Sequence, residues 1–517
     1  MRIAVRCDAS TRIGTGHLRR CLSLADALQA LGAEPRFVIR CHDAVAERIM
    51  ATRRYPVIWL SPPGDVPAPV ANAPAHAAWA GVTEAGDVIE TITALREWVP
   101  EFVIVDHYAF GARWHMTIRD ALHCTVVAID DLGDRALGAD ILLDANAAAD
   151  HTAKYAGRLA SGTRTLVGPR FAALASSYRS APRYTFDTAV RSIGIFMGGM
   201  DEHDASGAAL RTLRNDVGFA GAIEIVTTAT APHADALAQA CATDGNAALS
   251  TDLPDLSAFY ARHDLQIGAG GTSSYERACI GVPTIAVVLA ENQLTVVPIL
   301  TRLGLVRGAT IPGIAATGLL SEAGDLATVA TDLIARPDQR RVLAERSRQL
   351  VDGRGAERVA LSLLGNRMTL RPAVLADASM LHVWRNDRST RAVSINGDAI
   401  DYSDHLAWLA AVLASQTRQL FVAVVGTLPV GAIRFDLNEY EAWEISIYTD
   451  PALHGLGLGS KMLEAGEIAI MGAGDGDVVF HARVEPGNQA SSRMFERAGY
   501  HFQQDRLRKV RDGRIER

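Results

Sequence analysis

The sequence has 517 residues, 49% of them hydrophobic and 21% charged, which is typical of a folded protein with roughly two to four domains. Its net charge of −7 argues against a surface for nucleic acid or for an anionic membrane. No apolar run reaches the roughly 20 residues that span a bilayer, and the chain starts directly with a strand-like segment. We therefore expect a cytoplasmic protein with no membrane partner. The six cysteines have no metal-ligating spacing, so we expect no metal.

A glycine-containing loop, residues 14–20, joins the first predicted strand, residues 2–7, to the first predicted helix. In doubly wound folds, ligands bind at the carboxyl ends of the strands, where this loop lies. The glycines let a ligand approach the backbone closely, and a helix start favours negative charge. His17 can accept a proton near neutral pH, as a general base must. The alternative is a histidine that only caps a structural turn.

Three later strands are predicted to end in polar side chains. They cover residues 102–106, 125–131 and 141–146, and each apolar run finishes in Asp or Asn. Residues 61–86, which precede these strands, are rich in Pro, Ala and Gly and are predicted to form loops. Polar groups at one edge of a parallel sheet are typical of a binding cleft. A helix N-cap is the alternative for each single Asp.

A second α/β unit follows a crossover at about residues 176–190. Its strands are predicted at residues 192–197, 223–227, 265–268 and 284–289, with glycine loops after the first and third. The loop of residues 269–274 offers free backbone and hydroxyls at a helix start, which suits a diphosphate. Glu276 in the first turn of that helix is placed to accept both hydroxyls of a ribose. Its alternative role is to stabilise the helix dipole.

Together these features resemble the nucleotide-sugar enzymes of the GT-B fold. More closely, they resemble the nucleotide-sugar hydrolases of pseudaminic acid biosynthesis, in the family's order over about residues 1–350. The matching segments are Asp8 with residues 13–22, then 106–108, 129–131, 144–146, 168–171, 270–276 and 291–293. Residues 199–202 depart from the family's Gly-Ser-Asp-Pro.

The resemblance implies that the N-terminal region releases UDP from UDP-2,4-diacetamido-2,4,6-trideoxy-β-L-altropyranose. His17 is then the base that activates water, with Asp8 as the second catalytic residue. The implied contacts to UDP and substrate are Gly14, Gly16, Arg20, Tyr108, Gly199, Gly270, Gly271, Thr272, Ser273, Ser274, Glu276, Asn292 and Gln293. This scheme requires no metal.

A new domain begins after residues 365–366. Strands are predicted at residues 421–425, 430–436, 442–448 and 478–484, with a Gly-x-Gly-x-Gly segment at residues 455–459 before a helix. Such a segment forms an anion site for a pyrophosphate. A Rossmann fingerprint is the rival interpretation, but the segment comes late, after an antiparallel strand series.

Through residues 454–459 and 488–500, this region resembles the GNAT N-acyltransferases over about residues 368–510. Residues 385–387 and 405–408 resemble in particular the subgroup that acetylates 4-amino sugars on UDP. The resemblance implies acetyl-CoA as co-substrate. Its implied contacts are Ile447, Tyr448, Gly455, Leu456, Gly457, Gly459, Ser460 and Asn488. Phe495 occupies the position of a tyrosine acid in many relatives. Glu444, His481 and Glu485 are candidate bases, each with a strand-surface polar residue as the alternative.

We therefore predict an α/β protein with a GT-B-like pair of Rossmann-type halves, residues 1–180 and 181–365, and a C-terminal α+β GNAT domain, residues 366–517. The predicted function is bifunctional, with acetylation of a UDP-linked amino sugar followed by removal of UDP. The alternatives are a GT-B glycosyltransferase with an acyltransferase domain, and a UDP-sugar-binding module that serves the acyltransferase without hydrolysis. The sequence is compatible with a homo-oligomer and contains no nucleic-acid-binding motif.

Overall fold

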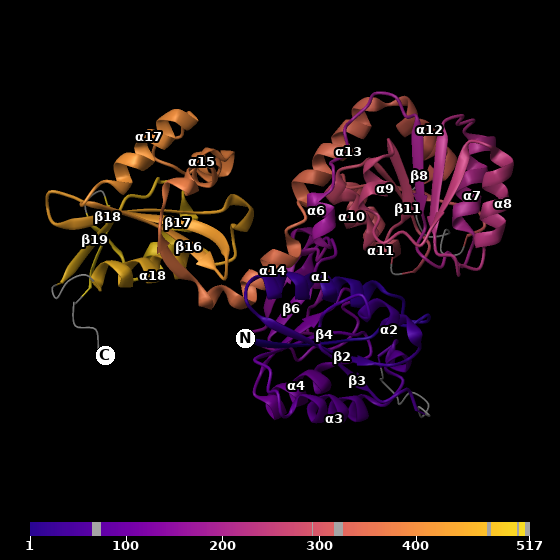
Figure 1. Cartoon of the computed structure of the whole chain (residues 1–517), viewed down its shortest axis with the longest axis horizontal. Coiled ribbons are helices and arrows are strands. Elements are labelled where there is room, and N and C mark those ends of the chain that lie inside the picture. Colours follow the sequence, from indigo (N-terminus) through magenta and orange to yellow (C-terminus); the bar gives the residue numbers. More distant parts are fainter. Residues whose placement is uncertain (65–73, 292, 315–323, 473–476, 504–505, 512–517) are drawn as a thin grey trace. The chain divides into compact units, whose positions relative to one another are not determined.

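The computed structural model describes residues 1–64, 74–291, 293–314, 324–472, 477–503 and 506–511 (Figure 1). The chain divides into two compact units. The first comprises Met1–Gln29 and Ala33–Val359, and the second comprises Ala30–Gly32 and Ala360–Arg517. The first unit contains two parallel sheets, and the second contains one mixed sheet.

The first parallel sheet has the strand order β3-β2-β1-β4-β5-β6-β7. These strands are β1 (Arg2–Cys7), β2 (Glu34–Arg40), β3 (Val57–Leu60), β4 (Phe102–Asp106), β5 (Thr125–Ile129), β6 (Ile141–Asp144) and β7 (Arg164–Val167). The main helices are α1 (Gly16–Ala30), α2 (Ala44–Met50), α3 (Glu84–Leu95) and α4 (Ala112–Leu122). The central strands are apolar on both faces because helices cover both sides of a doubly wound sheet.

The second parallel sheet repeats this plan in the order β10-β9-β8-β11-β12-β13-β14. Its strands are β8 (Ser192–Phe196), β9 (Ala222–Thr227), β10 (Ala247–Thr251), β11 (Leu265–Ala269), β12 (Thr284–Val287), β13 (Arg307–Thr310) and β14 (Gly324–Asp325). Its helices include α7 (Ala205–Arg211), α8 (Ala234–Asp244), α9 (Ser257–Ala261), α10 (Ser273–Ile280), α11 (Gln293–Arg302), α12 (Leu326–Ala335) and α13 (Pro337–Leu350). The predicted pair of Rossmann-type halves is thereby confirmed.

The sheet of the second unit has the order β15-β16-β17-β18-β19-β21-β20. Its strands are β15 (Thr369–Pro372), β16 (Arg418–Val425), β17 (Leu428–Leu437), β18 (Ala442–Thr449), β19 (Val478–Ala482), β20 (His501–Gln503) and β21 (Arg506–Arg511). The helices include α14 (Gly355–Leu364), which begins in the first unit, then α15 (Ala378–Asn386), α16 (Arg388–Arg391), α17 (Tyr402–Leu413), α18 (Leu458–Met471) and α19 (Gln489–Arg497). The predicted α+β architecture is confirmed.

Most predicted elements are present with small shifts of their ends. The predicted strand of residues 125–131 is shorter, because β5 ends at Ile129 and its two aspartates lie in the following loop. Within residues 61–86, predicted as loops, the structure has a 3₁₀ turn (Ala77–Ala80) and the start of α3 at Glu84. Among the described residues, no helix combines the length and apolar character needed to cross a membrane.

Candidate active sites

The order of the first sheet brings His17 beside a carboxylate that is 89 residues away in the sequence. Strands β1 and β4 are parallel neighbours, with Cys7 opposite Asp106. Helix α1 begins at Gly16, immediately after the loop that follows β1, so His17 lies over the end of β4. The Nδ1 atom of His17 is 2.6 Å from Oδ1 of Asp106, and the histidine is 8% exposed. The structure therefore contains a buried histidine–aspartate pair at the carboxyl edge of the sheet.

Arg20 ties this pair to a second carboxylate. It donates from Nε to Asp106 Oδ2 at 2.5 Å, from Nη2 to Asp106 Oδ1 at 2.6 Å, and from Nη1 to Asp131 Oδ2 at 3.0 Å. The Tyr108 hydroxyl donates to Asp131 Oδ1. Burial alone would raise the pKa of Asp106, but the positive charge of Arg20 and the His17 contact outweigh it and hold that pKa well below its ordinary value. Asp106 is therefore a fixed negative charge at neutral pH.

These contacts select one tautomer of His17. Asp106 is ionised and can only accept a hydrogen bond, so the 2.6 Å contact requires the proton on Nδ1. Arg20 Nη2 also lies 3.2 Å from Nδ1, but the contact of Nδ1 with the Asp106 carboxylate is much shorter, at 2.6 Å, and we assign the proton from it. The lone pair is then on Nε2, and the carboxylate stabilises the imidazolium that forms when Nε2 takes a proton. This arrangement is suited to general base catalysis.

Asp8 lies in a different network. Both oxygens of its fully buried carboxylate are occupied, by Arg6 Nη1 at 2.5 Å, by the Arg40 backbone amide at 2.8 Å and by the Nε2 atoms of His42 and His107, both at 3.2 Å. Burial alone would raise the pKa of Asp8, but Arg6 and the two histidines hold it well below its ordinary value. Among the described residues, no hydrogen bond or ion pair joins Asp8 to His17. The structure thus brings His17 together with Arg20 and Tyr108, but not with Asp8.

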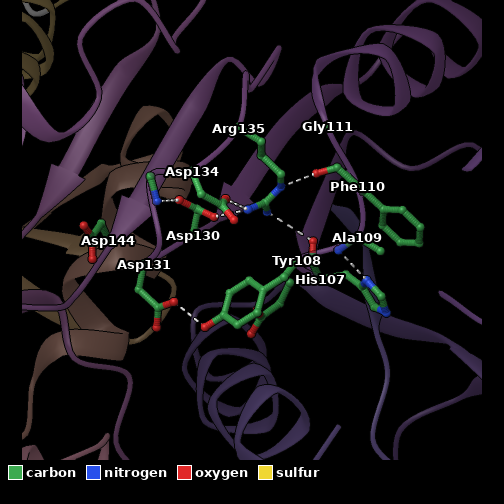
Figure 2. Close-up of polar contacts among 12 residues, drawn as sticks. His107, Tyr108, Ala109, Phe110, Gly111, Asp130, Asp131, Asp134, Arg135 and Asp144 are labelled. Carbon is green, nitrogen blue, oxygen red and sulfur yellow. Dashed lines mark hydrogen bonds and ion pairs between the residues drawn. The ribbon is translucent and has the colours of Figure 1, made fainter. Parts of the chain in front are cut away.

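The loop that carries Tyr108 is held by Arg135, as Figure 2 shows. Arg135 donates to the Phe110 carbonyl at 2.8 Å, to the His107 carbonyl at 3.3 Å and to Asp130 Oδ1 at 2.7 Å. It therefore cross-links the loops after β4 and β5, and these loops supply the Tyr108 and Asp131 side chains. The imidazole of His17 packs edge-on against the Tyr108 ring, with the ring centroids 4.6 Å apart.

The glycine loop of the second half follows β11 and leads into α10, as predicted. A side chain at Gly270 would collide with Val297, since an added Cβ would lie 2.2 Å from its Cγ2 atom. Arg277 is buried beneath the loop and donates to the Ala269 carbonyl at 2.8 Å and to the hydroxyls of Ser273 and Ser274, both at 3.2 Å.

Other predicted residues surround this loop. Glu276 is partly buried, its pKa is raised by burial, and the Tyr260 hydroxyl lies 3.4 Å from Oε2. Gln293 accepts a hydrogen bond from the Leu289 amide at 2.9 Å. Asn292 lies outside the described residues. Gly199 follows β8, and its carbonyl accepts from the Thr228 hydroxyl at 2.7 Å.

Residues of the first parallel sheet and its loops meet the start of α10 at a small cavity of about 30 Å³ in the first unit. Arg20, Asp131, Thr272 and Tyr275 are among its lining residues. The Tyr275 hydroxyl accepts a hydrogen bond from the Ala147 amide at 2.9 Å. Arg20 of α1 and Thr272 before α10 therefore lie at the same cavity; Gly14 precedes α1 and Gly16 is its first residue. No group of described residues is arranged to hold a metal ion.

The second unit contains a far larger cavity, of about 1030 Å³. Strand β18 pairs in parallel with β19 only as far as Ile445, although it continues to Thr449. Residues 446–449 therefore pair with β17 on one side and border the cavity on the other. The predicted residues Ile447, Tyr448, Gly455, Gly457, Gly459, Ser460 and Asn488 all line it, whereas Leu456 does not.

Two glycines of the segment that leads into α18 have backbone conformations that favour glycine. Gly455 and Gly457 have φ values of +81° and +74°, in the left-handed region that side chains with a Cβ rarely adopt. Asn488 caps α19 by accepting from the Ser491 amide at 3.1 Å. Phe495 lines the cavity and packs against Tyr500, with the ring centroids 5.0 Å apart.

Two of the three candidate bases, Glu444 and Glu485, line the cavity. His481 pairs directly opposite Glu444 on β19, but it is not among the lining residues. Glu444 in turn lies opposite Asp436 on β17, so two carboxylates face one another across adjacent strands. Like charges in this position repel one another.

Sequence reasoning placed Asp106 and Asp131 at the polar edge of the sheet, but it did not name them or Arg135 as catalytic or binding residues. A usable signal existed for the two aspartates, because each follows a buried parallel strand at the edge where His17 was expected. Arg135 gave no such signal, since its role depends on the Phe110 carbonyl, the His107 carbonyl and Asp130, which meet only in the fold.

Residues 367–501 match the family model described as an acetyltransferase (GNAT) domain. A search of curated proteins finds no significant match. Among solved structures, MurG from Acinetobacter baumannii is 14% identical, with 69% of this chain and 98% of that chain covered and a TM-score of 0.48. An S. aureus MnaA structure with UDP is 13% identical, with 70% and 95% covered and a TM-score of 0.47.

Aminoglycoside acetyltransferase AAC(6')-Ib, solved with coenzyme A, is 19% identical, with 28% of this chain and 95% of that chain covered and a TM-score of 0.26. The family model covers the described strands from β15 to β19 and the helices between them. The second unit of the chain therefore contains an acetyltransferase domain of the GNAT family.

Proposed function

We propose that the first unit hydrolyses a UDP-sugar, and that the His17–Asp106 pair is the observation that carries this function. In the proposed reaction, His17 Nε2 takes a proton from water, and the water oxygen attacks the anomeric carbon of the sugar. The bond between that carbon and the diphosphate oxygen breaks, and UDP leaves with the electron pair. Asp106 acts through His17 by holding its tautomer and stabilising the imidazolium.

The negative charge that develops on the departing diphosphate is stabilised by hydrogen-bond donors that are already in position. The loop of residues 270–274 supplies backbone amides at the start of α10, and Arg277 fixes this loop from beneath. Glu276 and Gln293 are the proposed contacts to the nucleoside, together with Asn292. Gly14, Gly16 and Gly199 allow close approach of the ligand to the first and second glycine loops. Asp8 and Tyr108 are proposed to support the His17 side of the cleft.

We further propose that the GNAT domain acetylates the 4-amino group of the preceding UDP-linked sugar, with acetyl-CoA as donor. The pyrophosphate of acetyl-CoA would bind the amides of residues 455–460, and the thioester carbonyl would meet the free side of β18 near Ile447 and Tyr448. The amine nitrogen attacks that carbonyl carbon, the C–S bond breaks, and the amine proton leaves through Glu444 or Glu485. The resemblance to the pseudaminic acid enzymes suggests UDP-4-amino-4,6-dideoxy-N-acetyl-β-L-altrosamine as the first substrate.

Mass spectrometry of the products tests both steps at once. The purified chain, given this UDP-amino sugar and acetyl-CoA, should yield the free diacetamido sugar, UDP and CoA. His17→Ala should abolish UDP release and leave acetyl transfer intact. Gly457→Ala should abolish acetyl transfer and leave UDP release intact when the acetylated UDP-sugar is supplied directly. Acetylated sugar that keeps its UDP would exclude hydrolysis. Equal loss of both activities in either variant, with each activity measured on its own substrate, would exclude two separate sites.

A further inference from the structure

The large cavity of the second unit has a polar compartment that the proposed acetyl-CoA contacts do not explain. It is formed where α15, α16 and α17 face β17, and we call it the acceptor compartment. Its residues are Arg385, Thr390, His405, Trp408, Arg434 and Asp436, and all six line the cavity.

Four of these residues each carry a buried polar atom without a hydrogen-bond partner among the described residues. The atoms are Arg385 Nη1, Thr390 Oγ1, His405 Nε2 and Asp436 Oδ1. Thr390 and His405 are only 5% and 2% exposed. Leaving such an atom unpaired is costly, and most buried polar groups in folded proteins have a partner. Four unpaired atoms at one cavity therefore indicate a polar ligand.

Asp436 is the carboxylate of the acceptor compartment, and Arg434 lies beside it. Arg434 donates to Asp436 Oδ2 from Nε at 2.9 Å, and its guanidinium lies over the Trp408 ring at 5.4 Å. Arg418 Nε is 3.7 Å from Asp436 Oδ1, beyond hydrogen-bond reach. Asp436 thus has one carboxylate oxygen held and one available to a donor such as an amine or hydroxyl.

Within the part of the chain that the structure describes, Arg385 forms no ion pair with a carboxylate. Its Nη2 atom donates to the Asn396 carbonyl at 2.5 Å. Burial lowers the pKa of Arg385 most. Tyr448 raises this pKa and the charge of Arg391 lowers it, and neither side chain is a carboxylate. A half-buried guanidinium with a neutral anchor and a buried, unpaired Nη1 atom is suited to bind an oxyanion. Arg385 also lowers the pKa of His405, after burial and His382, so the two side chains are neighbours.

We propose that the acceptor compartment binds the amine substrate as a molecule that carries an oxyanion for Arg385 and hydroxyl or amine groups for Thr390, His405 and Asp436. This inference rests on the proposed acetyl transfer to a UDP-linked amino sugar, whose diphosphate, hydroxyls and amine supply these groups. A polyamine has no oxyanion and leaves Arg385 unpaired.

The test compares two acceptors that differ in the UDP group, which carries the oxyanion. The rate of CoA release from the full chain is measured by chromatography with the UDP-4-amino sugar and with the same amino sugar lacking UDP. Arg385→Ala should raise KM for the UDP-linked acceptor about ten- to hundredfold, the usual effect of a lost charged hydrogen bond, and leave KM for the free sugar within about twofold. Thr390→Val, which keeps the side-chain shape, should raise KM for both acceptors alike.

Arg388→Ala is the matched control, because Arg388 is exposed on the neighbouring α16 and does not line the cavity. It should change neither KM. If Arg385→Ala changed KM equally for both acceptors, or for neither, the inference would be overturned. Wild-type transfer to the UDP-linked sugar would still support the proposed function in that case. Acetylation of spermidine but of neither sugar by the wild-type chain would overturn both.

Discussion

Asp106→Asn tests whether the His17–Asp106 pair is the centre of the proposed hydrolysis. The Asp106 carboxylate accepts from His17 Nδ1 at 2.6 Å and from Arg20 at 2.5 and 2.6 Å. An asparagine at this position replaces one acceptor oxygen by an NH₂ donor, so at least one of these contacts becomes donor against donor. If the NH₂ faces His17, it favours the tautomer with the proton on Nε2, which cannot act as a base.

The expected loss follows from these contacts. The variant loses both the tautomer control and the negative charge that stabilises the imidazolium. Loss of the carboxylate beside a catalytic histidine reduces kcat by about 10⁴ in the serine-protease triad, or about 5.5 kcal/mol of transition-state stabilisation. We expect a fall of about 10³- to 10⁴-fold in the rate of UDP release, because Arg20 also loses one of its two carboxylate partners.

Initial rates of UDP release measure this effect, and a thermal unfolding curve verifies that the variant is folded. Asp120→Asn is the control, since the Asp120 side chain is 73% exposed and its ion pair, as far as the described residues show, is with the neighbouring Arg119 at the surface. It should leave the rate unchanged. A folded Asp106→Asn protein that keeps more than about a tenth of the wild-type rate would refute the assignment of His17 and Asp106 as the base pair.

Three further predictions concern the first unit. Gly270→Ala should weaken UDP binding at least about tenfold by calorimetry, because its Cβ would meet Val297 at 2.2 Å, whereas Gly271→Ala, with no atom closer than 4.0 Å, should have the smaller effect. Arg135→Lys should speed amide hydrogen exchange in residues 107–111, because lysine cannot make all the contacts of the guanidinium, and unchanged exchange would contradict the cross-link. The low pKa of Asp8 means that its stabilising effect is complete above the unfolded pKa of about 4 and is lost as the pH falls below it. Melting temperatures between pH 7 and pH 3 should therefore fall more steeply for the wild type than for Asp8→Asn.

The sequence predicted much of the fold, because parallel strands and glycine loops leave local signatures. Buried strands read as apolar runs, and the two halves repeat the same strand–loop–helix order. Pairing across the sheet is not local. Asp106 was expected at the cleft, but its contact with His17 depends on β4 lying next to β1 rather than next to β3.

For Asp8, the motif predicted a role beside His17 that the geometry of the structure does not show. It lies close to His17 in the sequence, and the family resemblance grouped the two residues. Residues 6 and 8 are two apart on an extended segment, however, so their side chains point to the same face and form an ion pair. That periodicity was readable in the sequence. The unpaired atoms of the acceptor compartment were not, because they depend on helices and strands that pack together only in the folded unit.

The half-paired end of β18 has a consequence for handling the protein. Residues 446–449 present a short open edge of backbone amides and carbonyls beside a cavity, and such edges attract extended chains. The pantetheine arm of coenzyme A carries two amides on an extended chain, so it can lie along this edge as a missing strand would. We therefore expect coenzyme A to act as a solubilising agent as well as a co-substrate. Protein purified and concentrated with it should self-associate less, in light scattering, than protein without it.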